Sequence, residues 1–492
     1  MIYVKLEGHD WKYQVEDVLR LFFGSEKGEF IDREPPAEYR GIFILNRVEE
    51  RSGSFLVTTL LWLDGEKISS TDYEIYGTVP EGNDPLREVK REVKRQIYIC
   101  LSNHLKRELP WGTLTGIRPA KIVHELMQQG HSKEKILFIL RDYYKVSPEK
   151  AELVYEVAEN EKPILERAVG NTVGLYIGIP FCPSRCLYCS FTSNPIGRCI
   201  KLVKPYLEAL KTEIEGTAQI LKSKGYKIQS LYIGGGTPTA IDAESLKMFL
   251  TMVEQGFDLR DLEEYTLEAG RPDSLDLDKF RVIKNSRVDR ISINPQTMND
   301  ETLRLIGRDH SAQDIVEAFT LARQTGFNNI NMDLIIGLPG ETADMFKHTL
   351  DEIRKLDPES LTVHSMAVKR ASRLNENKES FSFTEAEEAV KMVDMALECA
   401  RSMKMRPYYL YRQKNMVGNL ENIGYCRPGS ESVYNVQIME EKQTIVALGA
   451  GAITKVVFPE ENRIERAANM KSVEDYIRRI DEMVERKRAL LI

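Results

Sequence analysis

The chain has 492 residues, enough for roughly two to four domains of about 150 residues each. Its composition, 42% hydrophobic and 29% charged, is that of a folded globular protein and excludes disordered, collagen-like and coiled-coil classes for the whole chain. The formal net charge of −7 excludes a protein built mainly to neutralise nucleic-acid phosphates, so no nucleic-acid partner is expected.

The sequence carries no clear signal for membrane insertion or export. A membrane span needs about 20 consecutive apolar residues, and the longest candidates, Phe55–Leu63 and Thr444–Thr454, are roughly half as long or contain polar residues. Residues 1–10 alternate apolar and charged side chains, unlike a secretory signal. Seven cysteines, with three of them inside eight residues, favour metal chemistry over a disulfide framework. We therefore expect a cytoplasmic protein without a membrane span.

The first third of the chain divides into two predicted regions. Residues 1–80 read as an α+β region of unknown role, with short strands and one helix near Tyr13–Phe23. Residues 81–170 are predicted to be helical and to begin with a long amphipathic helix from Asp84 to Leu109. We interpret the turn after this helix as a structural turn packed by Trp111 rather than as a ligand site.

Beyond Asn171, apolar strands alternate with helices. The predicted strands are Val173–Ile179, Ser230–Ile233, Tyr265–Ala269, Asp289–Ile293, Ile330–Ile336 and Leu361–His364. The predicted helices are Val203–Lys222, Ala243–Glu254, Leu277–Lys284, Ala312–Gln324, Ala343–Lys355 and Glu385–Met403. This alternation predicts an α/β fold, in which a full or partial barrel of about six strand–helix units spans residues 171–375. A helical and strand region over 376–492 is expected to complete the substrate pocket. In such barrels the chemistry lies where the strands end.

Three cysteines follow the first predicted barrel strand, at Cys182, Cys186 and Cys189. Offsets of four and three residues let the three thiolates face one centre, which suits three corners of an iron–sulfur cube and leaves the fourth iron open. A tetrahedral zinc ion would need a fourth ligand, for which the nearest extra candidate is Cys199. Chance clustering of buried cysteines is the remaining alternative.

This triplet, in its place after the first barrel strand, resembles the hallmark of the radical S-adenosylmethionine superfamily. The resemblance implies that the open iron chelates the amino and carboxylate groups of S-adenosylmethionine. One-electron cleavage then gives methionine and a 5′-deoxyadenosyl radical. The expected cofactors are a 4Fe-4S cluster and S-adenosylmethionine, and the expected electron donor is a reduced flavodoxin or ferredoxin.

Polar groups follow several of the other predicted strands. A glycine run precedes Thr237 after the second strand, and three glycines permit close approach of a small polar ligand to the backbone. Glu268, Gln296, Arg308 and Asp333 lie at or near the ends of later strands. For each residue alone, an ordinary turn or an ion pair is an alternative, but together they indicate a ribose and carboxylate site.

The order and spacing of these groups, from Gly174 to Lys455, resemble the oxygen-independent coproporphyrinogen III oxidase family. The stretches Leu109–Pro119 and Tyr408–Met416 resemble its HemZ branch, which also carries an N-terminal extension. The resemblance implies that S-adenosylmethionine is lined by Tyr176, Gly235, Gly236, Thr237, Glu268, Gln296, Arg308, Asp333, Ala367 and Ile453, with Tyr188 near the cluster. Core packing is the alternative for the apolar pair Ala367 and Ile453.

The family resemblance implies decarboxylation of two propionates of coproporphyrinogen III to vinyl groups, which gives protoporphyrinogen IX. The candidates for contact with such a substrate are Arg271, Arg412, Lys414 and Lys455, with Tyr409 and Tyr411 for stacking. Solvated charges and packed rings are the alternative. His310 has either a proton-handling or a structural role.

Phe191 stands where the oxidases have a fourth cysteine, and there it resembles the haem-chaperone branch. A haem-binding chaperone on the same scaffold is therefore the first alternative function. Another radical reaction on a tetrapyrrole, such as haem methylation or ring opening, is the second.

Overall fold

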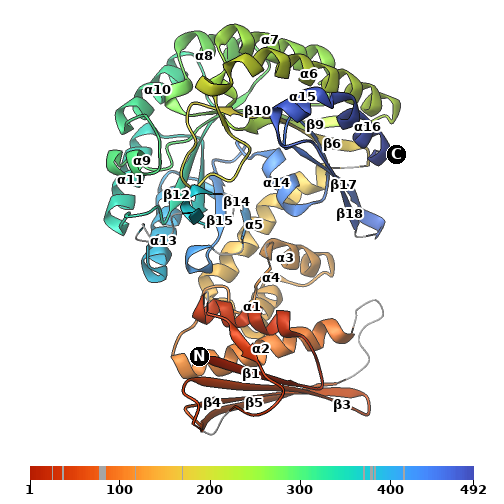
Figure 1. The fold of residues 1–492 in the computed structure, drawn as a ribbon, viewed down its shortest axis with the longest axis vertical. Helices are drawn as coiled ribbons and strands as arrows, with labels where there is room; N and C mark the ends of the chain where they lie inside the picture. The colour runs from red at the N-terminus through yellow and green to blue at the C-terminus, as the bar shows by residue number, and fades with distance from the viewer. Residues whose placement is uncertain are drawn as a thin grey trace. The chain divides into compact units, whose positions relative to one another are not determined.

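The computed structural model describes residues 1–24, 26–35, 38–76, 85–116, 118–168, 170–369, 372–376, 381, 384–413, 416–461 and 463–491. The chain forms two compact units (Figure 1). The N-terminal unit comprises Met1–Pro119 and Glu125–Tyr155, and the larger unit comprises Ala120–His124 and Glu156–Ile492. The predicted boundary near residue 80 lies outside the described residues. Every helix over the described residues is too short or too polar to cross a membrane.

The N-terminal unit is built on a five-stranded sheet in the order β2-β1-β3-β4-β5. Its strands are β1 (Ile2–Glu7), β2 (Gly28–Phe30), β3 (Ile42–Arg51), β4 (Ser54–Leu63) and β5 (Glu66–Tyr76). Two helices, α1 (Lys12–Phe23) and α2 (Pro85–Leu105), pack against this sheet and share one apolar core with it. The helix predicted near residues 13–23 is confirmed, and so is the long amphipathic helix.

The segment after α2 turns sharply around a buried tryptophan. Trp111 is 1% exposed, and the neighbouring Thr113 N–H donates to the Tyr144 carbonyl at 2.8 Å. The interpretation of this segment as a packed structural turn is therefore confirmed. The elements that follow are α3 (Pro119–Gln128), α4 (Lys133–Phe138), the π-helix η1 (Ile139–Tyr143) and α5 (Pro148–Arg167).

The larger unit contains an eleven-stranded sheet in the order β14-β15-β13-β12-β11-β10-β9-β6-β16-β17-β18. Its six predicted strands are β6 (Thr172–Ile179), β9 (Lys227–Gly235), β10 (Glu264–Gly270), β11 (Arg290–Ile293), β12 (Ile330–Ile336) and β13 (Ser360–Ser365). They lie parallel and side by side in chain order. The predicted α/β fold, a partial barrel with N-terminal and C-terminal extensions, is confirmed.

Helices cover the outer side of the curved parallel strands (Figure 1). They are α6 (Ile196–Ser223), α7 (Ala243–Gly256), α8 (Leu277–Lys284), α9 (Asp300–Leu305), α10 (Ala312–Gln324), α11 (Ala343–Leu356) and α13 (Ala386–Ser402). The short helix α12 (Arg373–Glu376) instead contacts Leu187 through the Leu374 N–H. The helices α8 and α10 begin and end at the predicted residues. Asp and Ser side chains at their N-caps accept hydrogen bonds from backbone N–H groups. Such capping residues are why the starts of these helices can be predicted from the sequence.

The C-terminal extension adds strands to both ends of the parallel sheet. These are β14 (Arg406–Tyr411), β15 (Asn422–Cys426), β16 (Thr444–Leu448), β17 (Ile453–Phe458) and β18 (Arg463–Ala468). The strand β16 runs parallel to β6 on the side away from β9 and was not among the predicted strands. Its helices are α14 (Val433–Glu440), α15 (Val473–Arg478) and α16 (Ile480–Leu490).

The helix α14 covers the amino ends of the barrel strands. Glu264, the first residue of β10, accepts hydrogen bonds from the Ser432 hydroxyl at 2.8 Å and the Tyr434 N–H at 2.9 Å. These bonds fix the first turn of α14, and the Tyr434 ring stacks on Tyr232 with centroids 4.5 Å apart. An aromatic layer thus fills the barrel on the side opposite the strand ends.

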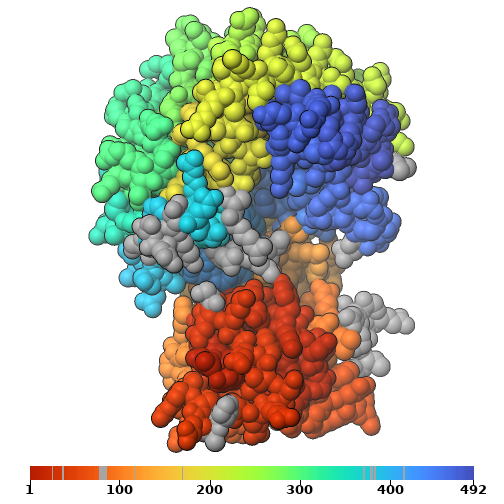
Figure 2. Space-filling model, viewed as in Figure 1, coloured from red at the N-terminus to blue at the C-terminus, as the bar shows by residue number. Residues whose placement is uncertain are grey.

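A buried ion pair joins α16 to α6. Lys487 donates from Nζ to Glu213 at 2.5 Å, and the two side chains are 1% and 0% exposed. Glu213 also accepts from the Gly449 N–H at 2.8 Å, in the loop between β16 and β17. Figure 2 shows the C-terminal helices, in deep blue, on the surface beside the yellow-green of α6. This network therefore fixes the loop at the carboxyl end of β16.

We predict that Lys487→Met destabilises the larger unit by about 3–5 kcal/mol, because it leaves the Glu213 carboxylate buried without its cation. The free energy of unfolding, measured in urea, tests this. Lys211→Met on the exposed face of α6 is the matched control, since Lys211 pairs with Glu215 in solvent and its loss is expected to cost less than about 1 kcal/mol. Equal losses in the two variants would contradict the prediction.

Candidate active site

The three cysteines lie on a loop that a small sheet closes at its base. After β6 the chain passes Pro180 into β7 (Phe181–Cys182), which pairs in parallel with β8 (Asn194–Pro195). The Asn194 backbone N–H and side-chain amide both donate to the Pro180 carbonyl, at 2.9 and 3.0 Å. Residues 182–194 therefore form a closed loop, the cysteine loop, at the carboxyl end of the first barrel strand.

Contacts from other barrel segments fix the middle of the cysteine loop. The Ser184 hydroxyl donates to the Gly307 carbonyl at 2.8 Å, and the Leu187 N–H donates to the Ile306 carbonyl at 2.9 Å. On the other side, the Leu374 N–H donates to the Leu187 carbonyl at 3.0 Å. The path of the loop is thus set by protein contacts alone.

The loop thiols suit an iron–sulfur cluster better than a zinc ion. Burial raises the pKa of Cys182 to about 11. The nearby thiols of Cys189 and Cys186 raise this pKa as well, which shows that the three thiols lie near one another. Iron must therefore displace their protons when it binds. A zinc ion with Zn–S bonds of about 2.3 Å would hold its sulfurs about 3.8 Å apart. Among the described residues, the cysteines form no group whose ligand atoms all lie within 4.8 Å of one another. The wider spacing leaves room for a cluster.

The glycine run at the end of β9 packs directly on the first cysteine. Gly236 donates its N–H to the Ile179 carbonyl at 2.8 Å, and a Cβ at Gly236 would lie 2.5 Å from the Phe181 oxygen and 2.9 Å from the Cys182 sulfur. The Thr237 hydroxyl donates to that sulfur at 3.6 Å. Only glycine permits this approach, which places the predicted cofactor residues Gly235, Gly236 and Thr237 beside the cysteine loop.

Tyr176 and Glu268 meet inside the barrel through a third residue, Tyr232. Tyr176 and Tyr232 are paired in register on β6 and β9, and their rings stack with centroids 6.4 Å apart. The Tyr232 hydroxyl donates to Glu268 at 2.5 Å. Burial raises the pKa of Glu268 to about 7, and the nearby Asp333 carboxylate raises it as well. Glu268 is therefore partly protonated near neutral pH.

The surroundings of Asp333 shift its pKa in the direction opposite to that of Glu268. Burial by itself would raise its pKa, but His364 and Asn331 hold it below its ordinary value. The Asn331 amide donates to Asp333 at 2.7 Å, and His364 Nε2 lies 3.9 Å from the other carboxylate oxygen. The site therefore holds one partly protonated carboxyl group, Glu268, and one ionised carboxylate, Asp333. The alternative of an Arg308–Asp333 ion pair has no support among the described contacts.

Gln296 is held in a left-handed backbone conformation, with φ at 67°. Its N–H donates to the Asp333 carbonyl at 2.8 Å, and its own carbonyl accepts from the Ile335 N–H at 3.0 Å. A non-glycine residue in this region carries strain that its surroundings must offset, and such strain is concentrated at functional sites. The bridge to β12 thus places Gln296 next to Asp333.

Arg308 lies beside the cysteine loop and is 6% exposed. Its guanidinium donates to the Asn294 carbonyl at 2.5 Å and to the Tyr188 hydroxyl at 3.4 Å. Tyr188 lies between the second and third cysteines, so Arg308 joins the end of β11 to the loop. Arg308 and Tyr188 therefore lie together at the cysteine loop, and their contact with the cofactors stays a prediction.

The two apolar candidates differ in exposure. Ala367 is 9% exposed and bridges to Met416, so core packing remains an adequate account of it. Ile453 begins β17 and is 46% exposed, so the alternative that it packs in the core is wrong. Nearby, a Cβ at Gly451 would lie 2.7 Å from the Thr192 hydroxyl, which places the loop before Ile453 against the cysteine loop.

The residues expected to meet substrate carboxylates are largely engaged elsewhere. Arg271 points at the cysteine loop, and Lys455 lies 3.4 Å from Glu441. Arg412 is 3% exposed and donates to the Asn419 carbonyl at 2.8 Å. Tyr409 and Tyr411 stack on one another with centroids 6.4 Å apart. Lys414 lies outside the described residues.

Two further residues at the site differ in burial: His310 is buried and Phe191 is exposed. His310 is 6% exposed and lies 3.5 Å from Asp273, and burial lowers its pKa, which favours its structural role over proton handling. Phe191 is 62% exposed, and the Lys369 ammonium lies 5.7 Å from its ring centroid. A large exposed aromatic ring therefore stands at the edge of the cysteine loop.

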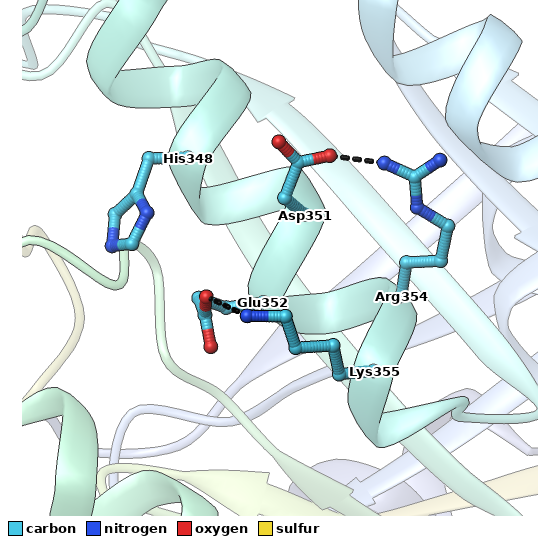
Figure 3. A pocket seen from close by; sticks show the side chains of 5 residues that line it. All are labelled: His348, Asp351, Glu352, Arg354 and Lys355. Atoms are coloured by element: carbon cyan, nitrogen blue, oxygen red, sulfur yellow. Dashed lines mark hydrogen bonds and ion pairs between the residues drawn. The ribbon is translucent and has the colours of Figure 1, made fainter.

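A depression on the surface of α11 is unrelated to this site (Figure 3). It is lined by His348, Asp351, Glu352, Arg354 and Lys355, all from one helix. Its charged groups already pair within the helix, Asp351 with Arg354 and Glu352 with Lys355. Exposed pairs of this kind contribute little and indicate no ligand.

Comparison with known proteins identifies the family. The sequence model of the Radical SAM superfamily matches residues 176–353, which hold the cysteine loop and most of the barrel. The chain is 38% identical over 491 residues, 98% of its length and 97% of the relative's, to "Oxygen-independent coproporphyrinogen-III oxidase-like protein HemZ" from Bacillus subtilis. The chain belongs to the HemZ-like branch of the radical SAM superfamily.

The chain is also similar to a second curated protein and to a solved structure. The protein "Heme chaperone HemW" from Bacillus subtilis is 32% identical over 280 residues, 56% of this chain and 69% of its own. The solved structure of coproporphyrinogen III oxidase (HemN) from Escherichia coli shares the fold, with a TM-score of 0.50 and 22% identity, over 66% of this chain and 73% of its own. The resemblance inferred from the motifs is thus confirmed.

The residues of this HemZ-like chain fit the cofactors of its superfamily, a 4Fe-4S cluster and S-adenosylmethionine. Cys182, Cys186 and Cys189 supply three thiolate ligands on a fixed loop. The close approach of Gly236 to Cys182 leaves backbone groups of the glycine run beside that loop. The cofactors supply a 5′-deoxyadenosyl radical when bound, and the individual S-adenosylmethionine contacts remain predictions.

We predict that Gly236→Ala lowers cluster assembly several-fold, because the added methyl group would displace the Phe181 oxygen and the Cys182 sulfur. Iron and sulfide per chain after anaerobic reconstitution measure the effect. Gly197→Ala is the control, since nothing lies within 4 Å of a Cβ there. A normal iron content in Gly236→Ala would show that the glycine run does not position Cys182.

We predict that Glu268 makes the cofactor-free protein less stable as the pH rises from about 4.5 to about 7. Its folded pKa of about 7 lies above the ordinary 4.5, so the folded state retains a proton that the unfolded state releases. The contribution is complete below that range and is lost above it, by about 3 kcal/mol. Melting temperatures of wild type and Glu268→Gln between pH 5 and 8 test this, and a constant difference between the two would contradict it.

Proposed function

We propose that the chain is a radical S-adenosylmethionine enzyme of tetrapyrrole metabolism that decarboxylates coproporphyrinogen III to protoporphyrinogen IX without oxygen. In this reaction each of two propionates loses a hydrogen atom from the carbon beside the ring, then carbon dioxide and one electron. A vinyl group is left at each position. The electron acceptor for that last step is a further participant.

The observation that carries this proposal is the full-length match to the oxidase-like HemZ protein. That match includes the N-terminal unit, whereas the HemW chaperone match covers 56% of this chain. The oxidase also provides a reason for radical chemistry, since a C–H bond beside the ring is unactivated. We further propose a reduced flavodoxin or ferredoxin as electron donor and the cytoplasm as the compartment.

The chain's own residues would position the cofactors and limit the access of water to the barrel. The fixed cysteine loop, with Arg308 beside Tyr188, sets the place of the cofactors at the strand ends. The rings of Tyr176, Tyr232 and Tyr434 stack on one another inside the barrel and would limit the access of water there. Ionised Asp333 and partly protonated Glu268 offer one acceptor and one donor for ribose and amino groups.

A haem-binding chaperone is the second candidate function, and Phe191 favours it. The ring is 62% exposed at the edge of the cysteine loop, where an apolar macrocycle could rest on it. The Arg271 and Lys455 contacts weaken the carboxylate pocket that the oxidase reaction requires. A third candidate, another radical reaction on a tetrapyrrole, has no contact that favours it.

We predict that anaerobic incubation of the reconstituted protein with coproporphyrinogen III, S-adenosylmethionine and a reductant yields protoporphyrinogen IX and carbon dioxide. Cys186→Ala is expected to lose all turnover, because the cluster loses one of three ligands, while the fold is retained. Product mass spectrometry and circular dichroism give the two readouts. Cleavage of S-adenosylmethionine without decarboxylation would reject the oxidase.

The same protein preparation distinguishes the chaperone proposal from the oxidase proposal. Haem titration followed by transfer to an acceptor protein tests stoichiometric delivery, which the oxidase proposal does not require. Phe191→Ala is expected to weaken haem binding if the chaperone proposal holds and to leave it unchanged if the oxidase proposal holds. Haem recovered with an altered mass would instead indicate the third candidate.

A further inference from the structure

Arg271 stands behind the cysteine loop, in a position that the substrate proposal does not use. It follows β10 directly, after Gly270, whose φ is 64°. Its own N–H donates to the Ala269 carbonyl at 2.8 Å, and the side chain is 3% exposed. A buried guanidinium needs partners for each of its nitrogens, and those partners show what this one does.

One edge of the guanidinium is held by Asp273. Nε donates to one carboxylate oxygen at 2.9 Å and NH2 donates to the other at 2.6 Å. This two-bond geometry fixes the plane of the guanidinium as well as its place. His310 Nδ1 lies 3.5 Å from the same carboxylate. Asp273 therefore aims Arg271 rather than merely neutralising it.

The remaining nitrogen, NH1, points into the cysteine loop. It donates to the Ser184 hydroxyl at 2.8 Å and to the Ser184 carbonyl at 3.2 Å. It also lies 3.7 Å from the Cys186 sulfur, within hydrogen-bond range for sulfur. Other side chains reach loop sulfurs as well: the neutral Thr237 hydroxyl donates to Cys182, and the Arg308 guanidinium is a second hydrogen-bond partner of Cys186. Cys186 thus receives charged donors and Cys182 a neutral one.

We propose that Arg271 is a positioning residue that sets the reduction potential of the cluster through Cys186. Hydrogen bonds to the sulfurs and nearby charge are among the factors that fix the potential of an iron–sulfur cluster. One-electron reduction adds a negative charge to the cluster, and a buried guanidinium at the Cys186 sulfur stabilises that charge. The proposal depends on the cluster but not on which substrate the enzyme takes.

The test is a redox titration of the reconstituted protein with dithionite, followed by electron paramagnetic resonance. Arg271→Gln is expected to make reduction about tenfold less favourable, which is a shift of about 59 mV to more negative potential for a one-electron couple. Arg271→Lys retains the charge without the two-bond geometry and is expected to shift the potential in the same direction by less. Iron per chain is measured in each variant, so that loss of cluster is separated from change of potential.

Asn194→Ala is the matched control, because the Asn194 side chain closes the same loop by bonding the Pro180 carbonyl rather than a sulfur. Its potential is expected to equal that of wild type, whatever its iron content. A wild-type potential in Arg271→Gln, or an equal shift in Asn194→Ala, would overturn the proposal and leave Arg271 a structural role. If Arg271→Gln retains no iron, the Arg271→Lys potential decides alone, and an unchanged value there contradicts the proposal. Because no substrate is added, failure here leaves the decarboxylation assay unaffected.

Discussion

The cysteine loop is fixed by hydrogen bonds to segments that follow several different barrel strands. Pro180 comes after β6, Ile306 and Gly307 follow β11, and Leu374 lies beyond β13, yet all four meet one loop of the chain. Because parallel strands carry their carboxyl ends to one edge, residues more than a hundred positions apart reach the same loop. The sheet therefore brings together the segments that position the ligand thiols.

Two acidic groups at the same edge of the sheet, Glu268 and Asp333, differ in protonation because their surroundings differ. Glu268 is hydrogen-bonded to a tyrosine hydroxyl in a buried place that favours its protonated form, whereas Asp333 is kept ionised by Asn331 and His364. Two carboxyl groups near one another with separated pKa values supply a donor and an acceptor to one ligand. Positive charge at the site is directed inward, at the cysteine loop, by Arg271 and Arg308.

Much of the larger unit was predictable because local patterns and tertiary packing agree. Each of the six parallel strands is a continuous apolar run, and helices such as α8 and α10 begin at an Asp or Ser cap. The strand β16 was missed, since its short apolar run lies far along the chain and pairs with β6 only in three dimensions. The long strand β5 was missed because its polar residues give little contrast between its two faces.

The sequence by itself determined the family, the strand–helix alternation and the cysteine triplet, because these depend on spacing along the chain. Only the tertiary structure decided where charged side chains point. Arg271, a substrate candidate by sequence, turns toward Cys186, and Ile453, a cofactor candidate for which core packing was the alternative, lies exposed. The stack that joins Tyr176, Tyr232 and Tyr434 likewise brings together strands and a helix separated by up to 258 residues of chain, 434 less 176. Side-chain direction depends on neighbours that are distant in sequence, and residue spacing carries no record of them.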